Sequence, residues 1–188
     1  MAADPDYGPH DGLPRPWTVR LNDDWTFEIT GLTGPVRFAA AAATPAGWWL
    51  ESVYVDGVNA ADQPVTFGAP DRSRSQVEIV FSSPAAEIAG RVLDERDEPI
   101  RRYEVVVFPV DRARWDAGSR YIRTARPAAE ARFSVPSLPP GDYWIAAVES
   151  LSDIAVRDPE VLSRLIGAAR RVTLSDGQRL TTELSVSR

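Results

Sequence analysis

The chain of 188 residues contains no cysteine, no lysine and a single histidine, His10. The lack of cysteine excludes disulfides and thiolate metal sites, and one histidine is too few for a zinc centre built on nitrogen ligands. Because His10 lies in a loose leading segment, a serine–histidine–aspartate triad is not expected either. The lack of lysine excludes lysine–asparagine isopeptide crosslinks and leaves arginine to carry all of the permanent positive charge.

Long apolar runs and an excess of positive charge are also missing. No stretch approaches the ~20 apolar residues needed to span a bilayer, and the first residues lack the basic start and apolar core of a signal peptide. The formal charge of -6 offers no broad basic surface, so nucleic acid is not expected as a partner. Without a phosphate-binding glycine loop as well, we predict no cofactor, no metal and no enzymatic activity.

Alternating apolar residues and frequent turn residues dominate what the chain does contain. Twelve glycines and sixteen prolines interrupt many short segments rich in β-branched and aromatic residues, which is typical of an all-β protein. Asn22–Asp24 and Asp56–Gly57 are the clearest turn signals. Strands are predicted at 18–21, 25–30, 36–42, 48–55 and 77–81, and then at 88–93, 103–108, 121–125, 131–135, 143–148, 171–174 and 180–186.

One short helix is predicted near 158–169. Asp158 is a good N-cap and Pro159 suits the first helical position. The following apolar residues recur at helical spacing and form one stripe: Val161, Leu162, Leu165, Ile166 and Ala169.

The sequence also repeats itself at a spacing of about 105 residues. Residues 25–38 are similar to 131–144, and 78–82 to 183–187. Two matched blocks at one spacing indicate two copies of one β module.

The two copies are unequal in length. The second copy begins with a strand pair whose counterpart in the first would precede Met1. We therefore predict a truncated β-sandwich module over 17–85 and a complete module over 86–188. Residues 1–16, rich in proline, glycine and aspartate, are predicted to be a disordered lead or linker.

The second copy carries a recognisable string: Gly90–Asp94, Pro99, Val105–Phe108, Arg132–Val135 and Leu138–Tyr143. This string resembles the carboxypeptidase regulatory-like modules of bacteria, which are transthyretin-like (prealbumin-like) β-sandwiches related to collagen-adhesin B-type repeats. The resemblance implies two tandem sandwich modules, the first incomplete at its N-terminus and the second with one short helix. It also implies a non-catalytic role, since in that family the chemistry lies in other domains.

Two roles follow from the resemblance. The first is a structural or interaction module of a larger, exported bacterial protein, located in the periplasm, at the cell surface or outside the cell. Its partners would be neighbouring domains of the parent chain or another protein. The alternative is a carbohydrate-binding module that uses exposed aromatics, with a polysaccharide as partner.

Candidate ligand-binding residues come from two places. Trp48 and Tyr54 share one strand phase, together with Leu50, and would form an outward aromatic platform opposite Val53 and Val55. A functional patch would leave Trp48 or Trp115 exposed, whereas a purely structural linker would bury both.

The second place is the segment 112–126, which holds five arginines and two aromatic residues. Trp115, Arg120 and Arg123 could clamp an anionic glycan or a carboxylate-bearing partner by bidentate contacts and stacking. The simpler interpretation is a long connection between strands, held in place by Trp115.

A weaker candidate lies in the turn at 56–62. The oxygens of Asp56, Asn59 and Asp62 could hold Ca²⁺, but the twelve-residue loop with a closing glutamate is missing. Asx-type bonds to the backbone are the preferred interpretation, and no metal site is predicted.

Overall fold

A computed structural model describes residues 18–40, 44–45, 47–68, 75–149 and 155–187. The predicted lead or linker over 1–16 lies outside these residues. The chain divides into two compact units: the first contains Met1–Pro45 and Leu50–Phe81, and the second contains Ala46–Trp49 and Ser82–Arg188. Strands make up most of the regular structure among the described residues of both units, in agreement with the all-β prediction. No helix among the described residues is long and apolar enough to cross a bilayer.

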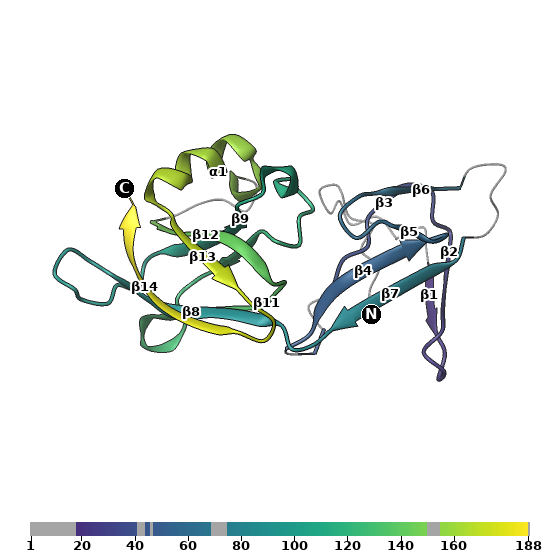
Figure 1. Ribbon diagram of the computed structural model, residues 1–188, viewed down its shortest axis with the longest axis horizontal. Helices are drawn as coiled ribbons and strands as arrows, with labels where there is room; N and C mark the ends of the chain where they lie inside the picture. The colour runs from purple at the N-terminus through teal and green to yellow at the C-terminus, as the bar shows by residue number, and fades with distance from the viewer. Residues whose placement is uncertain (1–17, 41–43, 46, 69–74, 150–154, 188) are drawn as a thin grey trace. The chain divides into compact units, whose positions relative to one another are not determined.

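The first unit is made of three small sheets (Figure 1). Each contains only two or three strands. The sheets are β1 (Thr18–Leu21) with β2 (Phe27–Thr30), β3 (Gly34–Val36) with β6 (Val65–Phe67), and β4 (Trp49–Val55) between β5 (Val58–Asn59) and β7 (Val77–Ser82).

The buried face of β4 changes phase within the strand. Leu50 and Ser52 are buried, and so are Val53 and Val55, whereas Tyr54 is exposed. Leu50 packs with Val53 and Val55 in the core of the first unit. The prediction that Leu50 shares an outward strip with Trp48 and Tyr54 is therefore wrong, because strict alternation does not hold across Ser52.

The second unit contains a seven-stranded sheet that nearly closes on itself. β12 pairs with β9 on one side and with β13 and β14 on the other, and β14 runs parallel to both β12 and β8. The strands are β8 (Ala86–Leu93), β9 (Glu104–Pro109), β10 (Arg123–Ala125), β11 (Arg132–Leu138), β12 (Gly141–Val148), β13 (Arg170–Leu174) and β14 (Arg179–Ser187).

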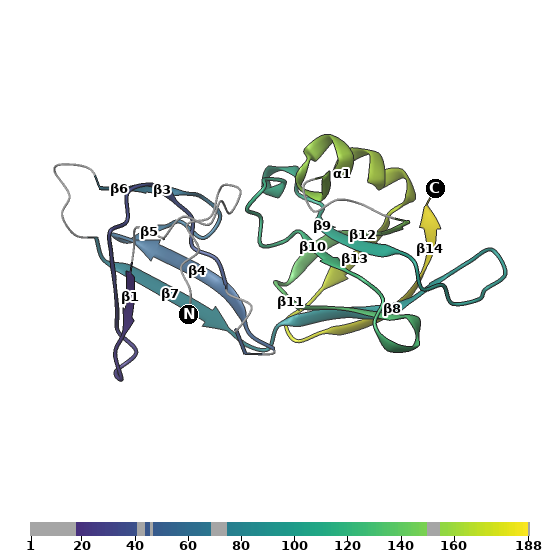
Figure 2. The same cartoon turned by 180° about the vertical axis from the view of Figure 1, so that it is seen from behind.

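Two cores stabilise this unit, one on each face of β9. Val105 and Val107 belong to the core between the two layers of the sheet, while Val106 and Phe108 belong to a second core beneath the helix. Figures 1 and 2 show β9, β12 and β13 in one layer, β8, β11 and β14 in the other, and the helix over the outer side of the first. The continuous apolar run of β9 thus reflects burial on both faces.

The helix α1 (Pro159–Leu165) forms where the sequence predicted it, although it is shorter. Asp158 caps it by accepting a hydrogen bond from the backbone N–H of Glu160 at 2.8 Å. Leu162 is fully buried in the second core. A 3-10 turn at Ile166–Ala168 continues the helix and leads into β13.

Candidate functional site

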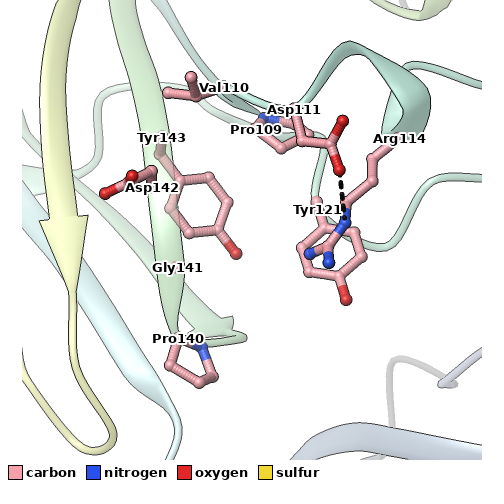
Figure 3. Close-up of a pocket in the computed structure, with 9 residues that line it drawn as sticks. All are labelled: Pro109, Val110, Asp111, Arg114, Tyr121, Pro140, Gly141, Asp142 and Tyr143. Atoms are coloured by element: carbon pink, nitrogen blue, oxygen red, sulfur yellow. Dashed lines mark ion pairs between the residues drawn. The ribbon is translucent and has the colours of Figure 1, made fainter.

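A recess of about 380 Å³ opens in the second unit, where β9 ends and β12 begins (Figure 3). We call it the arginine–tyrosine pocket. It is lined by Pro109, Val110, Asp111, Arg114, Tyr121, Pro140, Gly141, Asp142 and Tyr143.

Local sequence explains both walls of the pocket. Pro109 ends β9, and the 3-10 turn Arg112–Arg114 follows, capped by Asp111, whose carboxylate accepts a hydrogen bond from the backbone N–H of Ala113 at 3.0 Å. The opposite wall is the turn into β12, where Gly141 has a φ of 147°, in the region that favours glycine. The turn that carries part of the family resemblance therefore forms one side of the pocket.

Two buried tyrosines form the apolar part of the pocket. Tyr143 is 1% exposed, and its hydroxyl donates a hydrogen bond to the carbonyl of Pro139 at 2.8 Å. Burial raises the pKa of Tyr143, so this phenol stays protonated at neutral pH. The hydroxyl of Tyr121 accepts a hydrogen bond from Arg120 at 2.9 Å. Both side chains are held rigidly.

Two guanidinium groups lie against the ring of Tyr121. The central guanidinium carbon of Arg114 is 4.3 Å from the ring centroid, and that of Arg120 is 4.9 Å away. Both distances are within the range of cation–π attraction. Arg114 also forms an ion pair with Asp111, with Nε 3.4 Å from Oδ2 (Figure 3). This stacking fixes the guanidinium of Arg114 at the mouth of the pocket.

A third arginine, Arg123, comes from the edge strand β10. It pairs with Val107 of β9, so its side chain lies on the face of the sheet that covers the inter-layer core. Burial lowers the pKa of Arg123; Tyr143 opposes this effect in part, and the nearby charges of Arg157 and Arg120 lower the pKa by smaller amounts. Among the described residues no carboxylate forms an ion pair with Arg123.

The second carboxylate of the pocket, Asp142, is also held in place. It accepts hydrogen bonds from the hydroxyl of Thr173 at 2.5 Å and from Arg171 at 2.9 Å. The bond from Thr173, followed by that from Arg171, lowers the pKa of Asp142. General acid–base catalysis works best with a pKa near the operating pH, and here both Asp142 and Tyr143 are shifted away from neutrality. The arrangement is suited to holding a ligand by fixed charges and rings.

The sequence-predicted residues fall into two groups in the structure. Arg120 lies against Tyr121, and Arg123 lies on the face of β10 that covers the core containing Tyr121 and Tyr143, but neither arginine lines the pocket. Trp115 does not offer a face to a ligand: it is 6% exposed, packs edge-on against Phe108, and donates its indole N–H to the carbonyl of Pro109 at 2.7 Å. Trp115 therefore holds the connection between strands in place, as its simpler interpretation stated.

The predicted aromatic platform is not part of the pocket. Trp48, just before β4, is 42% exposed and Tyr54 is 36% exposed, and neither lines the pocket. Sequence reasoning did not single out Trp25, which is 86% exposed at the β1–β2 turn. The sequence signal for its exposure is its place in a polar hairpin turn, where it follows two aspartates and precedes a threonine.

The oxygens of the turn at 56–62 are engaged by the backbone. Asp56 Oδ1 accepts the N–H of Gln76 at 2.8 Å, and Asn59 Oδ1 accepts the N–H of Ala61 at 3.0 Å. The bond of Asn59 is the Asx-type contact expected of a turn, whereas that of Asp56 joins the turn to a residue twenty positions further along the chain. Within the described ranges, no three histidine, aspartate or glutamate side chains gather to hold a cation.

Comparison with known proteins reveals distant similarity of structure only. No protein-family model and no curated protein matches the chain. A candidate carbohydrate-binding protein of Pseudomonas aeruginosa is 18% identical, with a TM-score of 0.35, over 54% of this chain and 88% of its own. The pilus 2b backbone protein of group B streptococcus is 10% identical, with a TM-score of 0.35, over 78% of this chain and 51% of its own. The major pilin subunit of Bacillus cereus is 13% identical, with a TM-score of 0.34, over 75% of this chain and 57% of its own.

Proposed function

We propose that this chain is a non-catalytic interaction module of a larger, extracytoplasmic bacterial protein, and that the arginine–tyrosine pocket is its binding site. One observation carries the proposal: the polar groups of the pocket are already fixed. Tyr143 and Asp142 are engaged in internal hydrogen bonds, and Arg114 is stacked on Tyr121. Preorganised groups of this kind bind without a large loss of side-chain entropy.

The finer fold assignment is part of the same proposal. We infer that the second unit is a carboxypeptidase regulatory-like, transthyretin-like sandwich and that the first is its truncated tandem copy. The residues of the resemblance support this for the second unit, because Val92, Phe133, Leu138 and Tyr143 are all in its inter-layer core. Location outside the cytoplasm follows from the same resemblance.

A second candidate function is carbohydrate binding through the exposed aromatics. Trp25 at 86%, Trp48 at 42% and Tyr54 at 36% are among the most exposed large apolar side chains of the described chain. Aromatic rings that remain in water at this level provide flat surfaces on which a sugar can stack.

A retention assay tests the first proposal against this second one and against an enzyme. The full chain is mixed with cellulose, chitin, starch, polygalacturonate and gelatin gels, and both retained protein and released product are followed for a day. We expect saturable retention on at least one polymer, weakened in Arg114→Gln and unchanged in Trp48→Ala. Loss of retention in Trp48→Ala alone would support the aromatic platform instead. Steady release of product, or retention on none of the polymers, would contradict the proposal.

A further inference from the structure

The charges that line the arginine–tyrosine pocket are balanced within the protein. Arg114 lines the pocket with its Nε 3.4 Å from Oδ2 of Asp111. The carboxylate of Asp142 is paired with Arg171 at 2.9 Å, and Figure 3 shows it on the opposite side of β12 from the Tyr143 ring. A charged ligand would have to compete with one of these ion pairs, whereas an uncharged ligand leaves both intact.

The Arg114–Asp111 pair nevertheless has hydrogen-bonding capacity toward a ligand. Its two side chains are 42% and 59% exposed. Asp111 lies nearest the Nε of Arg114, and Figure 3 shows the two terminal nitrogens on the other side of the guanidinium. Among the described residues these nitrogens have no hydrogen-bond acceptor. Asp111 accepts one contact from Ala113 and one from Arg114, whereas an ionised carboxylate has about four acceptor sites. Donors and acceptors are therefore available side by side.

Apolar side chains form much of the rest of the recess. Tyr121 and Tyr143 are both buried, Pro109 ends β9, and Pro140 lies in the turn that begins β12. Such rings provide carbon surface against which the C–H groups of a ligand can pack. The recess of about 380 Å³ therefore suits a compact ring whose neighbouring substituents both donate and accept hydrogen bonds.

Neighbouring hydroxyls of a sugar have this property. Each hydroxyl is a donor and an acceptor at once, so two of them can accept from Arg114 and donate to Asp111. The N–H and C=O of a trans peptide unit point in opposite directions, so one peptide unit does not match an adjacent donor and acceptor. A carboxylate or phosphate on the sugar would be repelled by Asp111.

We propose that the arginine–tyrosine pocket binds one sugar unit of an uncharged polysaccharide. Two neighbouring hydroxyls bridge the Arg114–Asp111 pair, and the sugar ring packs against the tyrosine and proline side chains of the recess. This inference rests on the proposed function and names the class of ligand for the same site.

Calorimetric titration of the full chain with four neutral trisaccharides tests the inference. The four are cellotriose, maltotriose, mannotriose and tri-N-acetylchitotriose. Tri-galacturonate keeps the sugar rings but adds carboxylates, and the per-O-methylated form of the trisaccharide that binds best keeps the rings but removes the hydroxyl donors. We expect saturable binding of at least one neutral trisaccharide, and at least about tenfold weaker binding of tri-galacturonate and of the methylated sugar.

Asp111→Asn distinguishes charge balance from hydrogen bonding alone. Asparagine is also a good N-cap, so the 3-10 turn is retained while Arg114 loses its counter-charge. We expect the neutral trisaccharide to bind about tenfold more weakly to this variant and tri-galacturonate to bind more tightly than to the wild type. Arg114→Gln should weaken binding of the neutral trisaccharide by about tenfold or more without any gain for tri-galacturonate.

Arg112→Gln is the matched control, because Arg112 belongs to the same 3-10 turn as Arg114 but does not line the pocket. It removes the same charge and should change the affinity for the neutral trisaccharide by less than about twofold. Trp48→Ala should bind as the wild type does. Melting curves of all four variants verify that they fold. Equal loss in Arg112→Gln, or loss in Trp48→Ala alone, would place the sugar elsewhere and overturn the inference.

The remaining outcomes separate the ligand class from the proposed function. Tri-galacturonate binding as tight as that of the neutral sugars, or an unchanged preference in Asp111→Asn, would overturn the assignment of an uncharged ligand. Failure of all four neutral trisaccharides would do the same. In each of these cases retention on polygalacturonate or gelatin that depends on Arg114 would leave the proposed function standing. Failure of every probe and every polymer would overturn both.

Discussion

The two units of this chain differ in how completely they bury their apolar residues. The second unit has a seven-stranded sheet with a core on each face of β9, and its fully buried side chains include Tyr143, Phe108, Phe133 and Leu138. The first has three small sheets and one smaller core. Among the described residues, five of the six large apolar side chains that remain exposed belong to the first unit, namely Val19, Leu21, Trp25, Tyr54 and Val58.

This difference separates the two roles that a β module can have. A unit that closes its own core can present a rigid pocket, because its walls are held from both sides. A unit with small sheets and exposed apolar residues depends more on other contacts for its stability. Binding by fixed groups is therefore expected of the second unit, and the largest mutational effects on stability should also lie there.

The largest effect is expected from Gly90→Ala in β8. A Cβ at Gly90 would lie 1.8 Å from the carbonyl oxygen of Thr182 in β14 and 3.1 Å from the ring of Phe133. The two strands would have to separate, so we expect loss of more than ~4 kcal/mol of stability or failure to fold. Gly167→Ala is the control, since nothing lies within 4 Å of its Cβ position. Chemical denaturation measures both, and a folded Gly90→Ala protein of wild-type stability would contradict the parallel pairing of β8 and β14.

A second pair of variants tests the comparison between the cores. Phe133 and Phe67 each pack edge-on against another ring, with ring centroids 6.4 Å apart for Phe133 and Tyr103 and 6.1 Å apart for Phe67 and Phe38. Phe133 is only 2% exposed, whereas Phe67 is partly buried. We expect Phe133→Ala to cost ~3–5 kcal/mol and Phe67→Ala clearly less. The exposed Trp25→Ala should remain within ~0.5 kcal/mol of the wild type. Equal costs for the two phenylalanines, measured by thermal melting, would remove the distinction between the units.

A fragment covering 82–188 should melt within a few degrees of the corresponding transition of the full chain. It contains every strand of the seven-stranded sheet and both cores. Cooperative unfolding with a β-type circular dichroism spectrum is expected. A molten fragment would show that the seven-stranded sheet needs residues that precede Ser82, and the contrast between a closed and an open unit would then fail.

Most strands, the helix and the core could be predicted from the sequence, because an element that buries one face has apolar residues at a regular spacing. The β1 bounds, the Asp158 cap and the core positions of Phe133 and Leu138 all agree with the structure. Leu50 was misassigned because the buried face changes within β4, which no alternation rule anticipates.

The pocket was less accessible to sequence reasoning. The arginine-rich segment was visible, but the burial of Trp115 depends on a 3-10 turn that brings its indole back to Pro109. The position of Arg123 depends on the pairing of β10 with β9. Contacts of this kind join residues through tertiary pairing, for which local composition carries no signal.

The smallest effect in this series concerns two aspartates, one in each unit. The pKa of Asp24 is lowered by hydrogen bonds from the side chain and backbone of Thr26, and the pKa of Asp142 by bonds from Thr173 and Arg171. A carboxylate whose pKa is lower in the folded than in the unfolded state stabilises the fold at pH values above its unfolded-state pKa. That stabilisation is lost as the pH falls through the folded-state pKa.

Asp142→Asn should therefore lower the melting temperature slightly at pH 7, and the difference from the wild type should vanish in acid, below the ordinary pKa of an aspartate. Asp24→Asn should do the same with a smaller shift. Asp24 accepts hydrogen bonds only from the neutral backbone and hydroxyl groups of Thr26, whereas Asp142 accepts one from the charged Arg171. Asp23→Asn, a neighbour with no hydrogen bond among the described residues, should leave the melting temperature unchanged at every pH. Melting curves between pH 7 and pH 2.5 measure all three. A difference for Asp142→Asn that persists undiminished in acid would mean that this variant acts through packing, and the fixed ionised wall assigned to the pocket would be wrong.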